Sequence, residues 1–198
     1  MSVRGLTCLV LALSVTASSA QTAQTSQSAN RWRKTAPESF RANAQVTGTG
    51  GGVASGLTIQ IDKYTSDADH AALVKALKEG GNGAFVSTLK TSPVVGKVTM
   101  GDRTFTIRWA RQQIKGDSRR IAVATDSPVF FAGAGAVDAK PTAGFDIAVL
   151  EFTVDSIGLG KGSMAAAAHV KPGGPTGVQV DDYSGKRIDL VTVTRNSS

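Results

Sequence analysis

Three residues near the middle of the chain have side chains that could bind a metal ion: Asp67, Asp69 and His70. Zinc sites in proteins usually take at least three ligands from His, Cys or carboxylate side chains. On a helix, Asp67 and His70 share a face, whereas Asp69 lies about 100° around the axis from His70. The spacing therefore argues against a metal site, and we predict no metal ligands and no cofactor.

The same residues fit the start of a helix. Ser66 followed three positions later by Asp69 resembles a capping box, and Asp67 adds negative charge where the helix dipole favours it. Leu73 and Leu77 then form an apolar stripe at helical spacing. We therefore interpret the two aspartates as a helix start.

A second short helix follows the first. Gly80 and Gly81 end the first helix, and Pro93 closes a second one that carries Phe85 and Leu89. Large apolar side chains on such short helices need a surface to cover them. We predict a helical insertion over residues 66–90, a helix pair that packs against a sheet.

The sequence fits the motifs of common hydrolase active sites poorly. A serine hydrolase would need His70 or His169 as its base, and the sequence has no G-x-S-x-G elbow to supply the serine. Asp181 and Asp182 could act as the acid pair of a glycosidase, but adjacent strand residues point to opposite faces. We predict no catalytic residues; a hydrolase whose carboxylates come from distant segments stays open as the alternative function.

Two glycine-rich stretches have only a superficial likeness to phosphate-binding loops. GLGKGS at 158–163 has Gly162 where a Ser or Thr must follow the lysine, and GTGGGV at 48–53 lacks a strand–helix context. Both are interpreted as turns between strands, and we expect the strands on either side of residues 48–52 to form an antiparallel hairpin.

Basic residues gather in one predicted hairpin after residue 103. Such a ribbon could hold an anionic ligand through bidentate contacts of its guanidinium groups. A solvated face with cross-strand ion pairs is the other interpretation. The candidate ligand-binding residues are Arg108, Arg111, Lys115, Arg119 and Arg120.

The N-terminus has the layout of a secretory signal peptide. Arg4 provides the positive charge, residues 6–15 are apolar, and Ser18 and Ala20 are the small residues before a cut at Gln21. The apolar run is shorter than the roughly 20 residues that span a membrane. We predict a cleaved peptide over residues 1–20, and export to the periplasm or the extracellular space.

Cleavage would remove the only cysteine and lower the net charge from +7 to +6, because Arg4 is the one charged residue in the peptide. The mature chain would then have neither a disulfide nor a thiol nucleophile. A basic balance favours anionic partners. Outside the cell we expect such partners to be acidic polysaccharides, lipid headgroups or another envelope component, rather than nucleic acid. No segment after residue 20 is long and apolar enough to predict a membrane span.

Residues 21–38 are rich in Gln, Ser, Thr and Ala and show no apolar period, which predicts a disordered linker. From residue 39 the pattern changes to alternating apolar and polar residues, typical of strands. Residues 145–154 are apolar at nearly every position, which indicates a strand covered on both faces. We predict one domain over 39–198 that is mainly β with a small helical insertion: an antiparallel sandwich or partly open barrel with a helix pair packed on it.

Two stretches carry a resemblance to other proteins. LTIQIDKYTSDADHAALVKALKEGG at 57–81 and RRIAVATDSPVFF at 119–131 are similar to stretches of a group of uncharacterised exported bacterial proteins. The resemblance implies export and a single compact domain, and it implies no functional residue. From the residues we expect a non-catalytic exported domain that binds a ligand or partner in the cell envelope.

Overall fold

The computed structural model describes residues 36–46, 53–131, 142–182 and 187–196, which belong to one unit of the chain, Trp32–Ser198. The predicted signal peptide lies outside the described residues. The predicted linker does so up to residue 35, and the first strand begins within it, at Glu38. The described elements are β1 Glu38–Val46, β2 Val53–Ile61, α2 Asp67–Thr91, β3 Gly96–Met100, β4 Arg103–Lys115, β5 Ser118–Thr125, β6 Ile147–Val154, β7 Leu159–Pro172, β8 Val178–Asp182 and β9 Ile188–Arg195.

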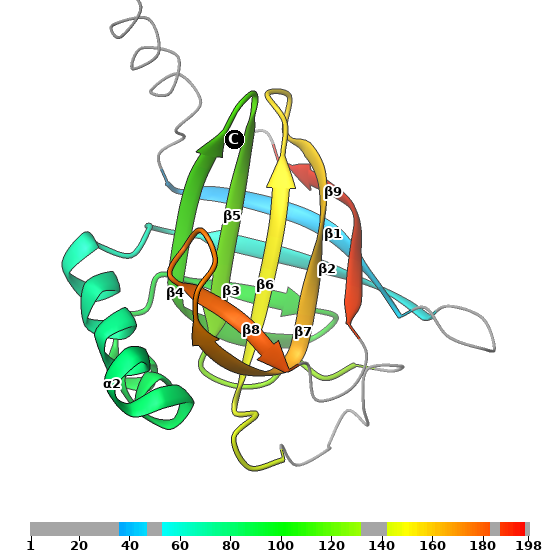
Figure 1. Ribbon diagram of the computed structural model, residues 1–198. Helices are drawn as coiled ribbons and strands as arrows, with labels where there is room; N and C mark the ends of the chain where they lie inside the picture. The colour runs from blue at the N-terminus through cyan, green and yellow to red at the C-terminus, as the bar shows by residue number, and fades with distance from the viewer. Residues whose placement is uncertain (1–35, 47–52, 132–141, 183–186, 197–198) are drawn as a thin grey trace, which may run out of the picture. The chain divides into compact units, whose positions relative to one another are not determined.

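Eight of these strands close into an antiparallel barrel (Figure 1). Their order is β6-β5-β4-β3-β2-β1-β9-β7, and β7 pairs again with β6 to complete the ring. The prediction of a mainly β chain with a small helical insertion is confirmed. The predicted sandwich or partly open barrel is wrong, because β9 joins β1 to β7 and leaves no gap in the ring.

The barrel interior is filled by side chains at alternate strand positions. Phe40 of β1 and Phe152 of β6 meet across it edge to face, with ring centroids 5.0 Å apart. Around them pack buried side chains from other strands, among them Ile59, Ile61 and Ile121. Each fully buried side chain of this size contributes about 1.5–3 kcal/mol, so the interior is the main source of stability.

The segment that follows β5 also enters this core. Val129 is fully buried and its backbone N–H donates to the Ala166 carbonyl at 2.8 Å. Phe131 is buried beside it, and Arg103 Nη1 donates to the Phe130 carbonyl at 3.1 Å. The apolar run 129–131 therefore anchors the connection between β5 and β6.

A second apolar layer lies between α2 and the outer face of the barrel. Leu73, Leu77, Phe85 and Leu89 of α2 are at most 1% exposed. They pack over outward-facing residues of β4 to β8, which are Trp109, Ala122, Ala124, Ile147, Val149, Ala165, Ala168, Val170 and Val178. Strands β6 and β7 are thus covered on both faces, as predicted for 145–154. Within the described residues, no helix is long and apolar enough to cross a membrane.

A β-bulge in β4 decides which residues face the helix. The register with β5 shifts between Ile107 and Trp109, so Ile107 packs in the barrel interior and Trp109 packs outside, beneath α2. Simple alternation predicts that both point inward with Phe105, and for Trp109 that prediction is wrong. The extra residue of the bulge reverses the facing of everything that follows.

Helix α2 begins at its predicted cap, and it kinks at the second of the two glycines that were predicted to end it. The Ser66 side chain accepts from the Asp69 N–H at 3.1 Å. Gly81 has φ 67° and ψ −161°, so the expected helix pair is one element with a kink. After the kink, Asn82 is buried: its Nδ2 donates to the Gly144 carbonyl at 2.8 Å, and its Oδ1 accepts from the Val170 N–H at 3.0 Å.

Replacing Gly81 with alanine should lower the free energy of unfolding by about 1–3 kcal/mol, because its φ/ψ region is nearly closed to residues with a Cβ. Gly83 is the matched control: it lies in the same helix, has no positive φ, and has no atom within 4 Å of the place that a Cβ would take. Gly83→Ala should stabilise by about 0.4–1 kcal/mol. Urea unfolding of both variants checks this, and equal effects would contradict it.

Candidate functional site

The five residues of the predicted basic patch do not share one surface. Three of its arginines are partly buried and held by acidic residues: Arg108 Nε lies 2.8 Å from Asp126 Oδ2, Arg111 Nη1 2.9 Å from Asp67 Oδ1, and Arg120 Nη2 2.6 Å from Glu151 Oε2. Lys115 is exposed at the β4–β5 turn. Arg120 and Glu151 form a pair between two strands, as the second interpretation expects. Arg108 pairs with the residue that follows β5, and Arg111 pairs with the first residue of α2.

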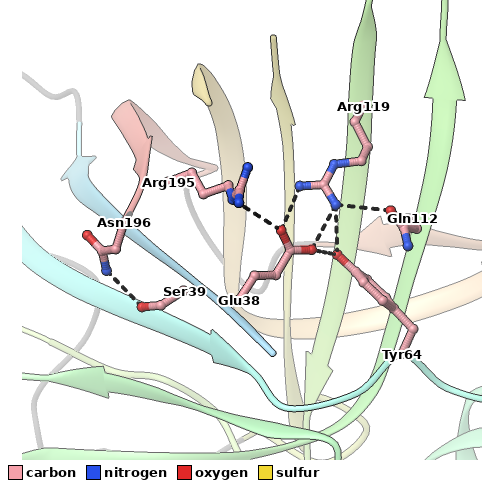
Figure 2. A network of polar contacts seen from close by, with 7 residues as sticks. All are labelled: Glu38, Ser39, Tyr64, Gln112, Arg119, Arg195 and Asn196. Atoms are coloured by element: carbon pink, nitrogen blue, oxygen red, sulfur yellow. Dashed lines mark hydrogen bonds and ion pairs between the residues drawn. The ribbon is translucent and has the colours of Figure 1, made fainter. Parts of the chain in front are cut away.

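Arg119 lies inside the barrel, apart from the other four residues of the predicted basic patch. It has the same parity on β5 as inward-facing Ile121 and Val123, whereas Arg120 points out. Its guanidinium meets Glu38 in a bidentate pair, Nη1 to Oε1 at 2.7 Å and Nη2 to Oε2 at 2.8 Å (Figure 2). Their side chains are only 5% and 2% exposed.

Three more residues join this pair at the end of the barrel where β1 and β5 begin (Figure 2). Tyr64 donates its hydroxyl hydrogen to Glu38 Oε1, and Gln112 Oε1 accepts from Arg119 Nη1 at 3.0 Å. Arg195 Nε lies 3.7 Å from Glu38 Oε2 and is buried without a hydrogen bond. We call Glu38, Tyr64, Gln112, Arg119 and Arg195 the Glu38 cluster.

The Glu38 cluster keeps its charges fixed. Burial and the adjacent Glu38 carboxylate raise the pKa of Tyr64 well above its ordinary value, so the phenol stays neutral. Burial disfavours the charged Arg119, but its hydrogen bonds to Glu38 and Tyr64 and the charge of Glu38 outweigh burial and raise the arginine pKa. A buried arginine paired in this way ties β1, β5 and the end of β2 together.

The three side chains of the hypothetical metal site have separate partners. Asp67 pairs with Arg111, and the Asp69 carboxylate accepts from the Ser66 hydroxyl at 2.7 Å. His70 Nδ1 accepts from Trp109 Nε1 at 3.2 Å. Within the part of the chain that the structure describes, no group of three His, Cys, Asp or Glu residues is placed to hold a metal ion.

His70 is held as a neutral acceptor. Burial, and next the positive charge of Arg111, lower its pKa below the ordinary value. An imidazole that accepts at Nδ1 carries its hydrogen on Nε2. His70 therefore serves as the polar partner of Trp109 beneath the helix.

The second histidine faces the acidic pair at the end of β8. His169 Nδ1 lies 3.6 Å from Asp181 Oδ2, and Lys171 Nζ lies 2.6 Å from Asp181 Oδ1. The hydrogen bond from Lys171 lowers the pKa of Asp181. An aspartate held by a lysine stays ionised, so Asp181 is not the proton donor that a glycosidase acid pair requires.

A groove of about 540 Å³ crosses the outer face of β9, β1, β2 and β3. This face lies outside the strands that α2 covers. The polar side chains that line the groove are Arg41, Asn43, Thr58, Thr99, Thr192, Thr194 and Asn196. We call it the strand groove.

The registers of four strands place a continuous polar row along the strand groove. Arg41 of β1 stands opposite Thr194 of β9 and opposite Thr58 of β2, and Thr58 stands opposite Thr99 of β3. Side chains that stand opposite one another project from the same face of a sheet. The row therefore runs Thr194, Arg41, Thr58, Thr99 across the strands.

Thr192 lines the strand groove in a strained conformation. Its φ is 54°, the one positive φ at a residue other than glycine among the described positions. A β-branched side chain disfavours this region, at a cost of about 1–3 kcal/mol. The strain accompanies a bulge, since Arg41 pairs with Thr194 while Asn43 pairs with Val191. Strained residues and bulges both concentrate at binding sites.

The Arg41 side chain is exposed in the strand groove and forms no hydrogen bond or ion pair with another described residue. Beside it, Asn196 is held in place because its Nδ2 donates to the Ser39 hydroxyl at 2.8 Å and its backbone N–H to the Ser39 carbonyl (Figure 2). A free guanidinium next to a fixed amide offers donors to an acidic group.

Sequence reasoning missed the strand groove. The alternation of β1 does mark Arg41 and Asn43 as outward-facing, and the β1–β2 hairpin is confirmed as predicted. The pairing of β1 with β9, about 150 residues later, carries no local signal. Only that pairing brings Thr192, Thr194 and Asn196 beside Arg41.

Comparison of the chain with protein families, with curated proteins and with solved structures gives no match.

Proposed function

We propose that this chain is an exported, non-catalytic binding domain that holds an anionic ligand of the cell envelope or its surroundings in the strand groove. The observation that carries the proposal is the guanidinium of Arg41, without a partner among the described residues, in the same groove as the strained Thr192. Export is supported by the signal-peptide pattern of residues 1–20.

Charge and geometry favour binding of an anion at this place. The chain carries a net charge of +7, which raises the local concentration of anions. Arg108, Arg111 and Arg120 are already held by carboxylates, whereas Arg41 is held by none of the described residues. A guanidinium can bind a carboxylate, sulfate or phosphate through two parallel hydrogen bonds.

The positions of three acidic residues in the barrel do not favour the hydrolase alternative. Glu38, Asp126 and Glu151 are each paired with an arginine. A glycosidase needs two carboxylates that face each other across the substrate. Each of these three carboxylates instead faces an arginine.

Arg41→Gln should weaken binding of anionic probes about tenfold or more, since a hydrogen bond to a charged group contributes about 1.5–3 kcal/mol. Lys115→Gln is the matched control, because it removes the same charge from the predicted basic hairpin. Heparin and phosphatidylglycerol vesicles serve as probes, with dissociation constants measured at fixed salt. Loss of binding in Lys115→Gln alone would move the site to the hairpin, and retention in both variants would overturn the proposal.

A further inference from the structure

Building on the function proposed above, we infer that the ligand of the strand groove is an acidic polysaccharide whose chain lies across β9, β1, β2 and β3. The shape of the polar row is the first observation that supports this. Four side chains on four neighbouring strands, spaced about 4.8 Å apart, form a strip about 14 Å long. A strip of this length suits several linked sugar units better than a single small anion.

The chemistry of the lining matches sugars. Thr58, Thr99 and Thr194 carry hydroxyls, and Asn43 and Asn196 carry amides. Hydroxyls and amides both donate and accept hydrogen bonds, as sugar hydroxyls do. A phosphodiester group by itself only accepts hydrogen bonds and would leave the accepting atoms of this lining unused. One guanidinium among neutral groups fits a polymer with an acidic group on some of its units.

Gly56 lines the strand groove and leaves space there that a side chain could fill. Neither its own backbone conformation nor a neighbouring backbone requires a glycine at this position. It stands opposite Asn43 and its φ is not positive. A Cβ added there would meet only Asn43 Oδ1, at 3.9 Å. Glycine in a strand interior weakens the strand and often marks a close approach of a ligand or of another backbone.

At three other strand positions, the close approach of a neighbouring backbone does require glycine. A Cβ at Gly96, Gly160 or Gly162 would lie 1.8–2.2 Å from a carbonyl oxygen of the neighbouring strand. Those positions need glycine for the barrel to form. Gly56 does not, so the room above it is left for what binds in the strand groove.

The lining disfavours other anionic macromolecules. Recognition of an anionic membrane usually takes a cluster of four to eight Lys and Arg residues, and among the described residues Arg41 alone brings such a charge to the strand groove. Single-stranded nucleic acids stack their bases on aromatic side chains, and none of the described residues that line the groove is aromatic. Hydrogen bonding to one sugar chain without an aromatic platform is weak per unit, so we expect a polymer to bind much better than its monomer.

The test compares alginate and heparin, which are acidic polysaccharides, with neutral dextran, phosphatidylglycerol vesicles and single-stranded DNA. Gly56→Tyr fills the groove, and tyrosine suits a strand. Gly56→Ala is the control, since its methyl group has room. The mature chain should bind alginate or heparin and not dextran. Gly56→Tyr should weaken that binding at least tenfold with an unchanged circular dichroism spectrum and melting temperature, and Gly56→Ala should change it less than twofold.

Each other outcome decides a different claim. Binding to vesicles or DNA that Arg41→Gln weakens, without binding to either polysaccharide, overturns the polysaccharide and leaves the proposed function standing. Equal binding to dextran overturns the acidic character of the ligand. If Gly56→Tyr leaves polysaccharide binding intact, the binding site does not lie in the strand groove. Absence of binding to every anionic probe overturns both the inference and the proposed function.

Discussion

Arg119→Met is expected to lower the free energy of unfolding by about 3–5 kcal/mol, the usual effect of removing one partner of a buried ion pair. Arg119 and Glu38 are 5% and 2% exposed and meet through two hydrogen bonds of 2.7 and 2.8 Å. Without the guanidinium, the Glu38 carboxylate would keep only Tyr64 as a close donor among the described residues, with Arg195 Nε at 3.7 Å. Urea unfolding at neutral pH measures the loss.

The neighbouring residue provides the control for this prediction. Arg120 pairs with Glu151 at 2.6 Å, but the two side chains are 30% and 25% exposed. Pairs with this access to water contribute about 0.2–1 kcal/mol, so Arg120→Met should have a small effect. Adding Glu38→Gln to Arg119→Met should recover part of the loss, because no buried charge is then left unpaired. Equal losses of unfolding free energy for the two single variants would contradict the prediction that the buried ion pair contributes more stability than the partly exposed one.

Trp109→Ala is the second variant with a large expected effect, a loss of about 3–5 kcal/mol. The indole is fully buried between α2 and the outer face of the barrel. Its removal leaves a cavity under Leu73, Leu77 and Phe85, which the two short halves of a kinked helix cannot refill without shifting.

Trp109→Phe separates packing from hydrogen bonding. Phenylalanine keeps most of the buried area but cannot donate to His70 Nδ1. We expect a loss of about 1–3 kcal/mol, from the missing hydrogen bond and the smaller ring. Thermal and urea unfolding of both variants check the order. A Trp109→Ala loss no larger than that of Trp109→Phe would show that α2 does not depend on this side chain.

The parts of the fold that depend on neighbouring residues could be predicted from the sequence. The cap at Ser66, the break at Gly81 and the β1–β2 hairpin are local, and all three are confirmed. The facing of Trp109 could not be predicted. Both faces of β4 carry apolar residues there, one face in the barrel interior and one under α2. The alternation of apolar and polar residues therefore does not distinguish the two faces, and the sequence pattern does not reveal the bulge.

The candidate site depends on distant pairings. Arg119 could have been placed inside, because it has the parity of Ile121 and Val123; a charged residue in that position is expected outside unless its partner is known. That partner, Glu38, lies 81 positions earlier in the chain. In the strand groove, Arg41 meets Thr194 across an even longer separation. Periodicity carries no information on such pairings.

Closure of the ring leaves β8 in an unusual position. Each of the eight barrel strands has two neighbours within the ring, whereas β8 pairs only with β7 in the described part of the sheet. Its other side is therefore an open edge, the kind of surface that recruits strands from other molecules and starts aggregation. The strand is only five residues long and ends in Asp181 and Asp182. A strand this short offers few N–H and C=O groups to a second copy, so the shortness of β8 limits self-association.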